Sequence, residues 1–205
     1  KASPYTPRKI NHPKFRNMSL NAALDYLSDK PDGEFVVRPS SKGEDSLNLT
    51  WKFFGSIVVH LNLREGPKLP FMSIAPKLYL NKDEFDSLDD IIHKYIIPCN
   101  QHMESLVRHN KFIRGEIDYI ESCLVEDKKM NPLHIPYYYG CFENAPQFVV
   151  LVYMVKDERS NEKIIKEYIK IKPGGLFFHS LNALTTWLVQ RELSITGLSK
   201  VLEEG

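Results

Sequence analysis

Three consecutive segments in the first half of the chain have the pattern of strands: an apolar run that ends in Arg38 (residues 34–38), and two segments in which apolar and polar residues alternate (residues 47–53 and 57–63). A period of two predicts strands that have one apolar and one polar face. The short, glycine-containing connection at residues 54–56 predicts an antiparallel hairpin between the last two strands. If the three strands are neighbours, one set of side chains shares the polar face. These are Arg38, Asn48, Thr50, His60 and Asn62.

A helical spacing of apolar residues flanks these strands on both sides. Leu20 begins such a pattern, Ser19 is placed to cap it, and a proline–aspartate–glycine turn ends it. A second apolar stripe covers residues 88–96, and a further helix is predicted after Pro98. Residues 1–13 contain three prolines and little apolar pattern, so they predict an extended lead-in.

The same order of elements recurs in the second half of the chain. Helices are predicted at residues 117–125 and 181–188, and strands at residues 135–142, 147–155 and 163–171. The Phe-Asp-Ser-Leu at residues 85–88 is matched by Phe-His-Ser-Leu at residues 178–181. This repeat predicts an α+β protein with two domains in tandem, each a small antiparallel sheet flanked by two helices. We expect the pair to pack as one rigid unit. The predicted parts are a lead-in (1–10), a first domain (11–97), an inter-domain helix or linker (98–115), a second domain (116–193) and a tail (194–205).

The composition is that of an ordinary soluble globular protein, with 42% apolar residues, 26% charged residues and a net charge of +1. Proteins that bind a nucleic-acid backbone usually have a larger basic excess, so nucleic acid is not expected as the main ligand. No apolar stretch is long enough to span a membrane. The first residue is a lysine, which suggests a piece of a longer protein.

Patterns typical of catalysis or metal binding are missing from the sequence. The three cysteines are far apart and odd in number, which favours a reducing compartment over a disulfide framework. A cysteine phosphatase needs an arginine six residues after its cysteine, and those positions hold Ser105, Lys129 and Gln147. His102 and His109 have no evident third partner for a metal ion. We therefore expect neither enzymatic activity nor a cofactor.

The end of the first predicted strand is suited to bind a phosphate. Arg38 is followed by two serines, a lysine and a glycine within five residues. An arginine can fork onto a phosphate while loop hydroxyls and backbone N–H groups bind the remaining oxygens. An arginine on an edge strand can instead pair with a carboxylate. The convergence of Ser40, Ser41, Lys42 and His60 favours the phosphate.

Several motifs resemble a known family. The segment Gly-Glu-Phe-Val-Val-Arg-Pro-Ser-Ser at residues 33–41 resembles the phosphate-binding strand of an SH2 domain, a module that binds phosphotyrosine. His60 stands where that family has a third-strand histidine, and residues 85–88 resemble the start of its second helix. More closely, residues 38–43 and 49–52 resemble the tandem SH2 region of the Spt-six family of eukaryotic elongation factors and histone chaperones. This resemblance covers nearly the whole chain.

The resemblance implies a nuclear, chromatin-associated transcription module. Its expected partner is the phosphorylated largest subunit of RNA polymerase II, bound at its C-terminal repeats or at the linker before them. Arg38 would hold the phosphate, residues 40–42 would line the loop beneath it, and His60 would orient the pocket. Asn48 and Thr50 complete the candidate phosphate-binding set. We expect a monomer.

Two positions differ from ordinary phosphotyrosine-binding members. Asn21 stands where the first helix usually has an arginine, and Asn62 stands where the third strand usually has a lysine. Both cations would lie against the tyrosine ring, so their loss weakens binding to phosphotyrosine. Phosphoserine and phosphothreonine are therefore expected to be tolerated as ligands.

The second copy differs further, because its first strand at residues 135–142 contains no arginine. Lysines and arginines elsewhere could hold a second phosphate: Lys170, Lys172, Lys111 and Arg191. Solvated lysines on a scaffold domain are an equally good interpretation. Two alternatives to phosphopeptide binding stay open. The tyrosines at residues 137–139 could stack on RNA bases, or the chain could be a structural interaction domain with a vestigial pocket.

Overall fold

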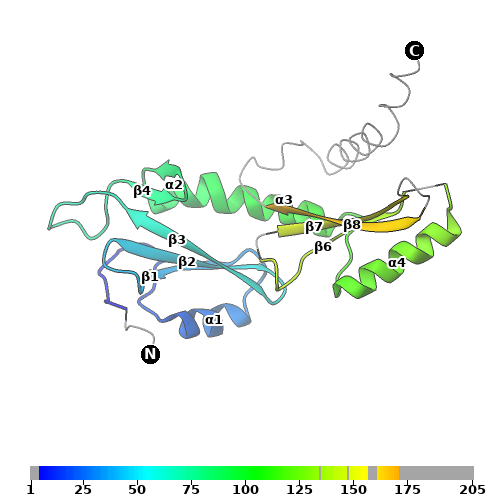
Figure 1. The fold of residues 1–205 in the computed structure, drawn as a ribbon. Coiled ribbons are helices and arrows are strands. Elements are labelled where there is room, and N and C mark those ends of the chain that lie inside the picture. The colour runs from blue at the N-terminus through cyan, green and yellow to red at the C-terminus, as the bar shows by residue number, and fades with distance from the viewer. Residues whose placement is uncertain (1–4, 134, 147, 157–160, 171–205) are drawn as a thin grey trace, which may run out of the picture. The chain divides into compact units, whose positions relative to one another are not determined.

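The structure, a computed structural model, describes residues 5–133, 135–146, 148–156 and 161–170. The chain divides into two compact units, residues 1–103 and 104–205. Each unit has its own antiparallel sheet, ordered β1-β2-β3-β4-β5 in the first and β6-β7-β8 in the second (Figure 1). The predicted closing helix at residues 181–188 lies outside the described residues. Among the described residues, every helix is too short or too polar to cross a lipid bilayer.

The first part of the chain contains the predicted helix, three strands and helix in that order. Its elements are α1 (Leu20–Ser28), β1 (Phe35–Pro39), β2 (Ser46–Phe54), β3 (Ile57–Glu65), β4 (Leu78–Leu80), β5 (Asp83–Phe85), α2 (Leu88–Ile91), the π-helical turn η1 (Ile92–Ile96) and α3 (Ile97–Val107). The short hairpin β4–β5 was not predicted. Phe85, which was placed at a helix start, is the last residue of β5.

The strand register confirms the predicted two-faced sheet. Arg38 lies opposite Asn48, which lies opposite Asn62. Thr50 lies two residues along β2 from Asn48, on the same face, and opposite His60. The other face is apolar and includes the buried Trp51. In Figure 1, α1 lies on one side of this sheet, and α2 and α3 lie on the other.

Helix α1 begins where the sequence predicts, because the Ser19 hydroxyl accepts a hydrogen bond from the N–H of Ala22 at 3.2 Å. The buried residues of this helix, Ala23 and Leu27, pack against Val36 of β1. Since Val36 is in the same register row as Thr50, α1 covers part of the sheet face that bears the polar side chains.

The sequence-based expectation that a new helix starts after Pro98 is wrong in one respect, because the helical run continues through this proline. A proline has no N–H to donate and clashes with the carbonyl four residues earlier in an α-helix. Here the preceding turn is π-helical, and the N–H of Ile97 donates to the carbonyl of Ile92. The wider turn makes room for the proline ring without ending the helix.

Asn100 joins this helical run to the apolar face of the sheet. Its side-chain oxygen accepts a hydrogen bond from Trp51 Nε1 at 3.0 Å, and its Nδ2 donates to the carbonyl of Gly33 at 2.9 Å. Gly33 has φ +89°, and a Cβ there would lie 2.9 Å from the Asn100 amide nitrogen. A glycine is therefore needed at the turn before β1.

The second unit repeats the helix and three strands of the first. Its described elements are α4 (Ile117–Met130), β6 (Tyr137–Gly140), β7 (Phe148–Lys156) and β8 (Glu162–Lys170). Strand β6 is shorter than the predicted 135–142. Residues Ile120 and Leu124 of α4 pack on one face of β7 and form a core cluster with Phe142, Val150, Val152 and Met154.

A backbone detail shows that the two units are copies of one plan. Phe15 forms an isolated parallel bridge with Val37 of β1, and Phe112 forms the same bridge with Tyr139 of β6. The two backbone hydrogen bonds beside each bridge measure 2.8 and 2.9 Å in both units. Val37 and Tyr139 are therefore equivalent positions, which fixes the alignment of the two first strands.

Candidate phosphate-binding site

Arg38 is a buried arginine without a carboxylate partner among the residues that the structure describes. Only 7% of its surface is exposed. Its Nε donates to the hydroxyl of Thr50 at 3.1 Å, and its Nη1 donates to the carbonyl of Pro39 at 3.3 Å. Burial lowers the pKa of this guanidinium below its ordinary value. Since a buried charge is costly without a counter-ion, the site favours an anionic ligand.

Thr50 is fully buried and connects Arg38 to His60. Its Oγ1 accepts from Arg38 and lies 3.4 Å from His60 Nδ1. The hydroxyl proton is thus free to point at Nδ1, which leaves the proton of a neutral imidazole on Nε2. His60 is exposed at the surface, and partial desolvation of its ring, followed by the charge of Arg38, lowers its pKa. Thr50 was predicted as a phosphate ligand. In the structure it is buried, and its contacts position the side chains of Arg38 and His60.

The loop after β1 turns tightly and exposes polar side chains. Ser40 is buried, and its hydroxyl accepts a hydrogen bond from the N–H of Lys42 at 3.1 Å. Ser41 and Lys42 are exposed. Gly43 has φ +137°, a conformation that other residues rarely adopt, so the chain can turn tightly here. The loop that follows Arg38 therefore exposes a serine and a lysine to solvent.

The row of residues beside Arg38 contains two asparagines. Asn48 and Asn62 are both half-buried. Among the described residues, Asn62 Oδ1 is buried and has no hydrogen-bond partner. An unpaired buried acceptor is costly, and this one lies in the same register row as Arg38. Asn21, on the first turn of α1, is exposed. Neither Asn21 nor Asn62 provides a cation that would lie against a tyrosine ring.

The second unit has no room for the equivalent of Arg38. Because Tyr139 is equivalent to Val37, Gly140 stands in the place of Arg38. A Cβ on Gly140 would lie 2.6 Å from Ile120 Cδ1 and 2.8 Å from Phe142 Cζ. Apolar side chains thus fill the space that the arginine and its ligand would need.

The basic residues proposed for a second phosphate site are not brought together by the described part of the chain. Lys111 forms an ion pair with Asp127 at 3.2 Å and lies over the rings of Tyr137 and Tyr138. Lys170 is half-buried at the end of β8. Lys172 and Arg191 lie outside the described residues, and a second site stays a prediction.

The tyrosines of β6 are engaged in contacts within the second unit. Tyr139 is fully buried. Tyr138 donates its hydroxyl proton to Asp127 at 3.2 Å, and Tyr137 packs its ring edge-on against Tyr139 with 6.0 Å between centroids. These contacts favour packing over a platform for RNA bases.

Sequence analysis missed one signal of the repeat and one cation. The pattern His-x-Lys-Phe occurs at residues 12–15 and again at residues 109–112, and both copies precede a first strand in the same way. The missed cation is Arg64 of β3. It lies two residues after Asn62 on the same strand, so the alternation that placed Asn62 on the polar face also places Arg64 there. Among the described residues, no group of three potential ligands for a metal ion is found.

The first unit is a sheet between two helices, with a buried arginine and a serine-containing loop at the end of its first strand. The described part of the second unit repeats the helix and three strands with Gly140 in place of the arginine. A family model described as SH2 domain matches residues 1–187. The chain belongs to the SH2 domain family.

Relatives of the chain are transcription elongation factors. It is 31% identical to the Transcription elongation factor SPT6 homolog of Arabidopsis thaliana over 179 residues, which is 85% of this chain. It is 30% identical to Transcription elongation factor SPT6 of Drosophila melanogaster over 204 residues, or 94% of this chain. In both comparisons it spans 11% of the relative's length.

Two solved structures have the same tandem fold. One is described as "A Tandem SH2 Domain in Transcription Elongation Factor Spt6 Binds the Phosphorylated RNA Polymerase II C-terminal Repeat Domain(CTD)". Its TM-score is 0.74 and its sequence identity is 27%, and the match covers 82% of this chain and 85% of the solved chain. The other contains the tandem SH2 domains of Antonospora locustae Spt6, with TM-score 0.68 and 19% identity over 86% of this chain and 92% of its own. At this identity, the similarity of the second structure supports only the fold of this chain.

Proposed function

We propose that this chain is the phosphopeptide-binding module of a nuclear transcription elongation factor. Its proposed ligand is the phosphorylated largest subunit of RNA polymerase II, in the C-terminal repeats or the linker before them. The observation that carries the proposal is the buried guanidinium of Arg38, which has no carboxylate partner in the described chain and stands beside a serine-rich loop. The related tandem SH2 structure, described as binding the phosphorylated repeat domain, supports this partner.

The mechanism is equilibrium binding without covalent chemistry. A phosphate has up to two negative charges and several acceptor oxygens. Arg38 supplies the charge and a fork of donors, while the loop N–H groups, Ser41 and Lys42 surround the remaining oxygens. His60 can donate from Nε2. Because Asn21 and Asn62 leave the ring position without cations, the phosphate provides most of the binding free energy. Phosphoserine and phosphothreonine should therefore be accepted in addition to phosphotyrosine.

Replacing Arg38 by alanine should weaken phosphopeptide binding by about 2–5 kcal/mol, the range for truncating one partner of a buried charged pair. The measurement is fluorescence-polarisation titration with three repeat-region peptides that differ only in whether serine, threonine or tyrosine is phosphorylated. Arg38→Lys keeps the charge but loses the fork of donors, so its affinity should lie between those of the parent protein and Arg38→Ala. Arg108→Ala removes an arginine whose side chain is 81% exposed and should leave the affinity unchanged.

Several outcomes would contradict this proposal. Equal binding by the parent protein and Arg38→Ala would show that Arg38 does not hold the phosphate. Binding that survives dephosphorylation of the peptide would favour a structural interaction domain. Binding to single-stranded RNA that is insensitive to Arg38→Ala would favour the RNA-binding alternative. A panel in which only the phosphotyrosine peptide binds would refute the tolerance for other phosphorylated residues.

A further inference from the structure

Arg64 is an exposed arginine two residues along β3 from Asn62. It lies opposite Ser46 of β2 and opposite Tyr79 of β4. Two residues away along the strand, Asn62 lies opposite Asn48, which lies opposite Arg38. Positions two apart on a strand point to the same face, so Arg64 belongs to the polar face that bears Arg38.

The Arg64 guanidinium has a defined place on this face. It lies over the ring of Tyr79, 4.9 Å from the centroid. The hydroxyl of Tyr79 is hydrogen-bonded to Glu84, which raises the pKa of that tyrosine. A stacked arginine keeps its donor edge free for a planar or tetrahedral oxyanion. Stacking on Tyr79 therefore orients Arg64 and leaves its hydrogen-bonding groups available.

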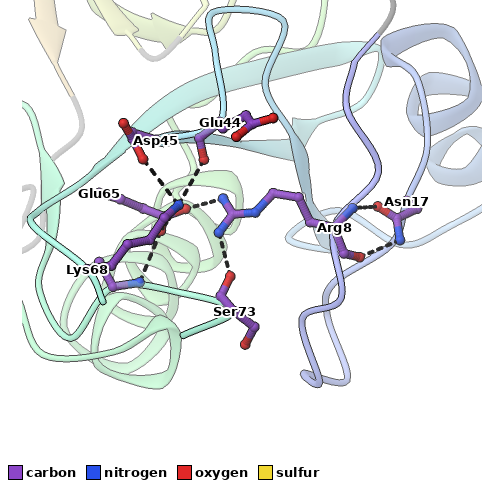
Figure 2. Close-up of polar contacts among 8 residues, drawn as sticks. Arg8, Asn17, Glu44, Asp45, Glu65, Lys68 and Ser73 are labelled. Atoms are coloured by element: carbon purple, nitrogen blue, oxygen red, sulfur yellow. Dashed lines mark hydrogen bonds and ion pairs between the residues drawn. The ribbon is translucent and has the colours of Figure 1, made fainter. Parts of the chain in front are cut away.

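Two of the acids that line this region, Glu65 and Asp45, are paired with other cations. Glu65 is fully buried and forms an ion pair with Arg8, while Lys68 lies 3.2 Å from both Glu65 and Asp45 (Figure 2). The N–H of Ala75 also donates to Glu65 at 3.0 Å. Within the described chain, Arg64 forms no ion pair of its own. Glu65 and Asp45 are thus paired with Arg8 and Lys68, and neither carboxylate is paired with Arg64.

A hollow of about 670 Å³ lies at this end of the sheet. Arg64, Lys68 and Tyr79 line it, together with Glu44 and Asp45 from the phosphate-binding loop. The same loop therefore contributes to both places, with Ser40 and Lys42 at one end and Glu44 at the other. A ligand bound at Arg38 can reach the hollow without leaving the loop. The hollow is large enough for a side chain of that ligand.

We propose that Arg64, held against Tyr79, binds a second oxyanion of the same peptide whose first phosphate is held by Arg38. The inference rests on the proposed function and deepens it, because the ligand becomes a segment with two neighbouring negative groups. The shared chemistry is an oxyanion, which a phosphorylated residue or a glutamate can supply. Glu44 is exposed and also lines the hollow. Its carboxylate repels an oxyanion, so the bound group must lie nearer to Arg64 than to Glu44.

The test uses the full chain and a peptide series with one fixed phosphothreonine. A second phosphoserine, a glutamate or an alanine is placed at each neighbouring position in turn, and affinities are measured by fluorescence polarisation. We expect a second phosphate at the matching position to tighten binding about fivefold over alanine, and a glutamate to tighten it less. Arg64→Gln should abolish this gain while leaving the affinity for the singly charged peptide within about twofold. Glu44→Gln should enlarge the gain.

The controls separate this inference from the proposed function. Lys9→Gln removes an exposed cation and should preserve the gain from the second charge. The inference is overturned if Arg64→Gln weakens the singly and doubly charged peptides equally, or if no position gives a gain in the parent protein. In both cases Arg38-dependent binding would still stand. Absence of any phosphate-dependent binding by the parent protein would overturn both proposals. A gain with phosphoserine but none with glutamate would assign the site to phosphate alone.

Discussion

Thr50 shows, at the scale of single residues, how one buried hydroxyl can organise two basic groups. It accepts from Arg38 and faces His60 Nδ1, so one small side chain positions both. Sequence periodicity predicted that these three residues share a face, because alternation in a strand is a local property. It could not predict which of them is exposed, since that depends on how α1 covers the sheet.

The ionisation of His60 should make stability depend on pH. Partial desolvation and the charge of Arg38 lower its pKa in the folded chain, while the unfolded value is about 6.5. The folded state thus binds this proton less readily than the unfolded state. The resulting stability is present above about pH 6.5 and is lost as the pH falls through that value and the lower folded pKa.

We therefore expect the free energy of unfolding to decrease between about pH 7.5 and pH 5.5, and to decrease less in His60→Gln. Urea denaturation at a series of pH values measures both slopes. The comparison between parent and variant removes the contribution of carboxylates, which titrate in both. Identical slopes would show that the environment of His60 does not change its proton affinity.

At the scale of elements, Gly140 decides how closely α4 packs on β6. Gly140→Ala would place a methyl group 2.6 Å from Ile120 Cδ1, and overpacking of this kind typically costs about 1–3 kcal/mol. We expect a lower midpoint of chemical denaturation when unfolding is monitored with a probe in the second unit. Adding Ile120→Val removes the clashing Cδ1 and should recover part of the loss. A variant as stable as the parent would show that α4 can shift at no cost.

The helices and strands near the site followed local rules that sequence alone reveals. Alternation predicted β2 and β3, and the Ser19 cap predicted the start of α1. The π-helical turn before Pro98 was not predicted, because a proline by itself indicates a helix end, and the wider turn that accommodates it depends on packing. The ion pair between Arg8 and Glu65 joins residues 57 positions apart, and no local pattern predicts such a contact.

For the whole molecule, the repeat matters most for how many phosphates can be bound. The first unit has Arg38, and the second has Gly140 at the equivalent position. A short peptide with one phosphate should therefore bind one per chain in isothermal titration calorimetry, and Arg38→Ala should remove that binding. Lys170→Gln should not change it. A second binding event that is lost in Lys170→Gln would instead show that the second unit holds phosphate through a lysine.

The sequence predicted the tandem plan because the order of elements recurs, and because the motif around Arg38 is distinctive. It could not establish the second unit's chemistry, because the absence of an arginine says nothing about what fills the space. The structure answers this with the side chains of Ile120 and Phe142, which close over Gly140.

The ion pair between Arg8 and Glu65 also decides where this domain can be excised from a longer polypeptide. Glu65 is fully buried and Arg8 nearly so, and removing one member of a buried pair costs about 3–5 kcal/mol. That loss is comparable with the whole stability of a small domain. A recombinant fragment that begins only a few residues after Arg8 would retain every strand and helix of the first unit and still be at risk of unfolding. The practical boundary lies upstream of Arg8.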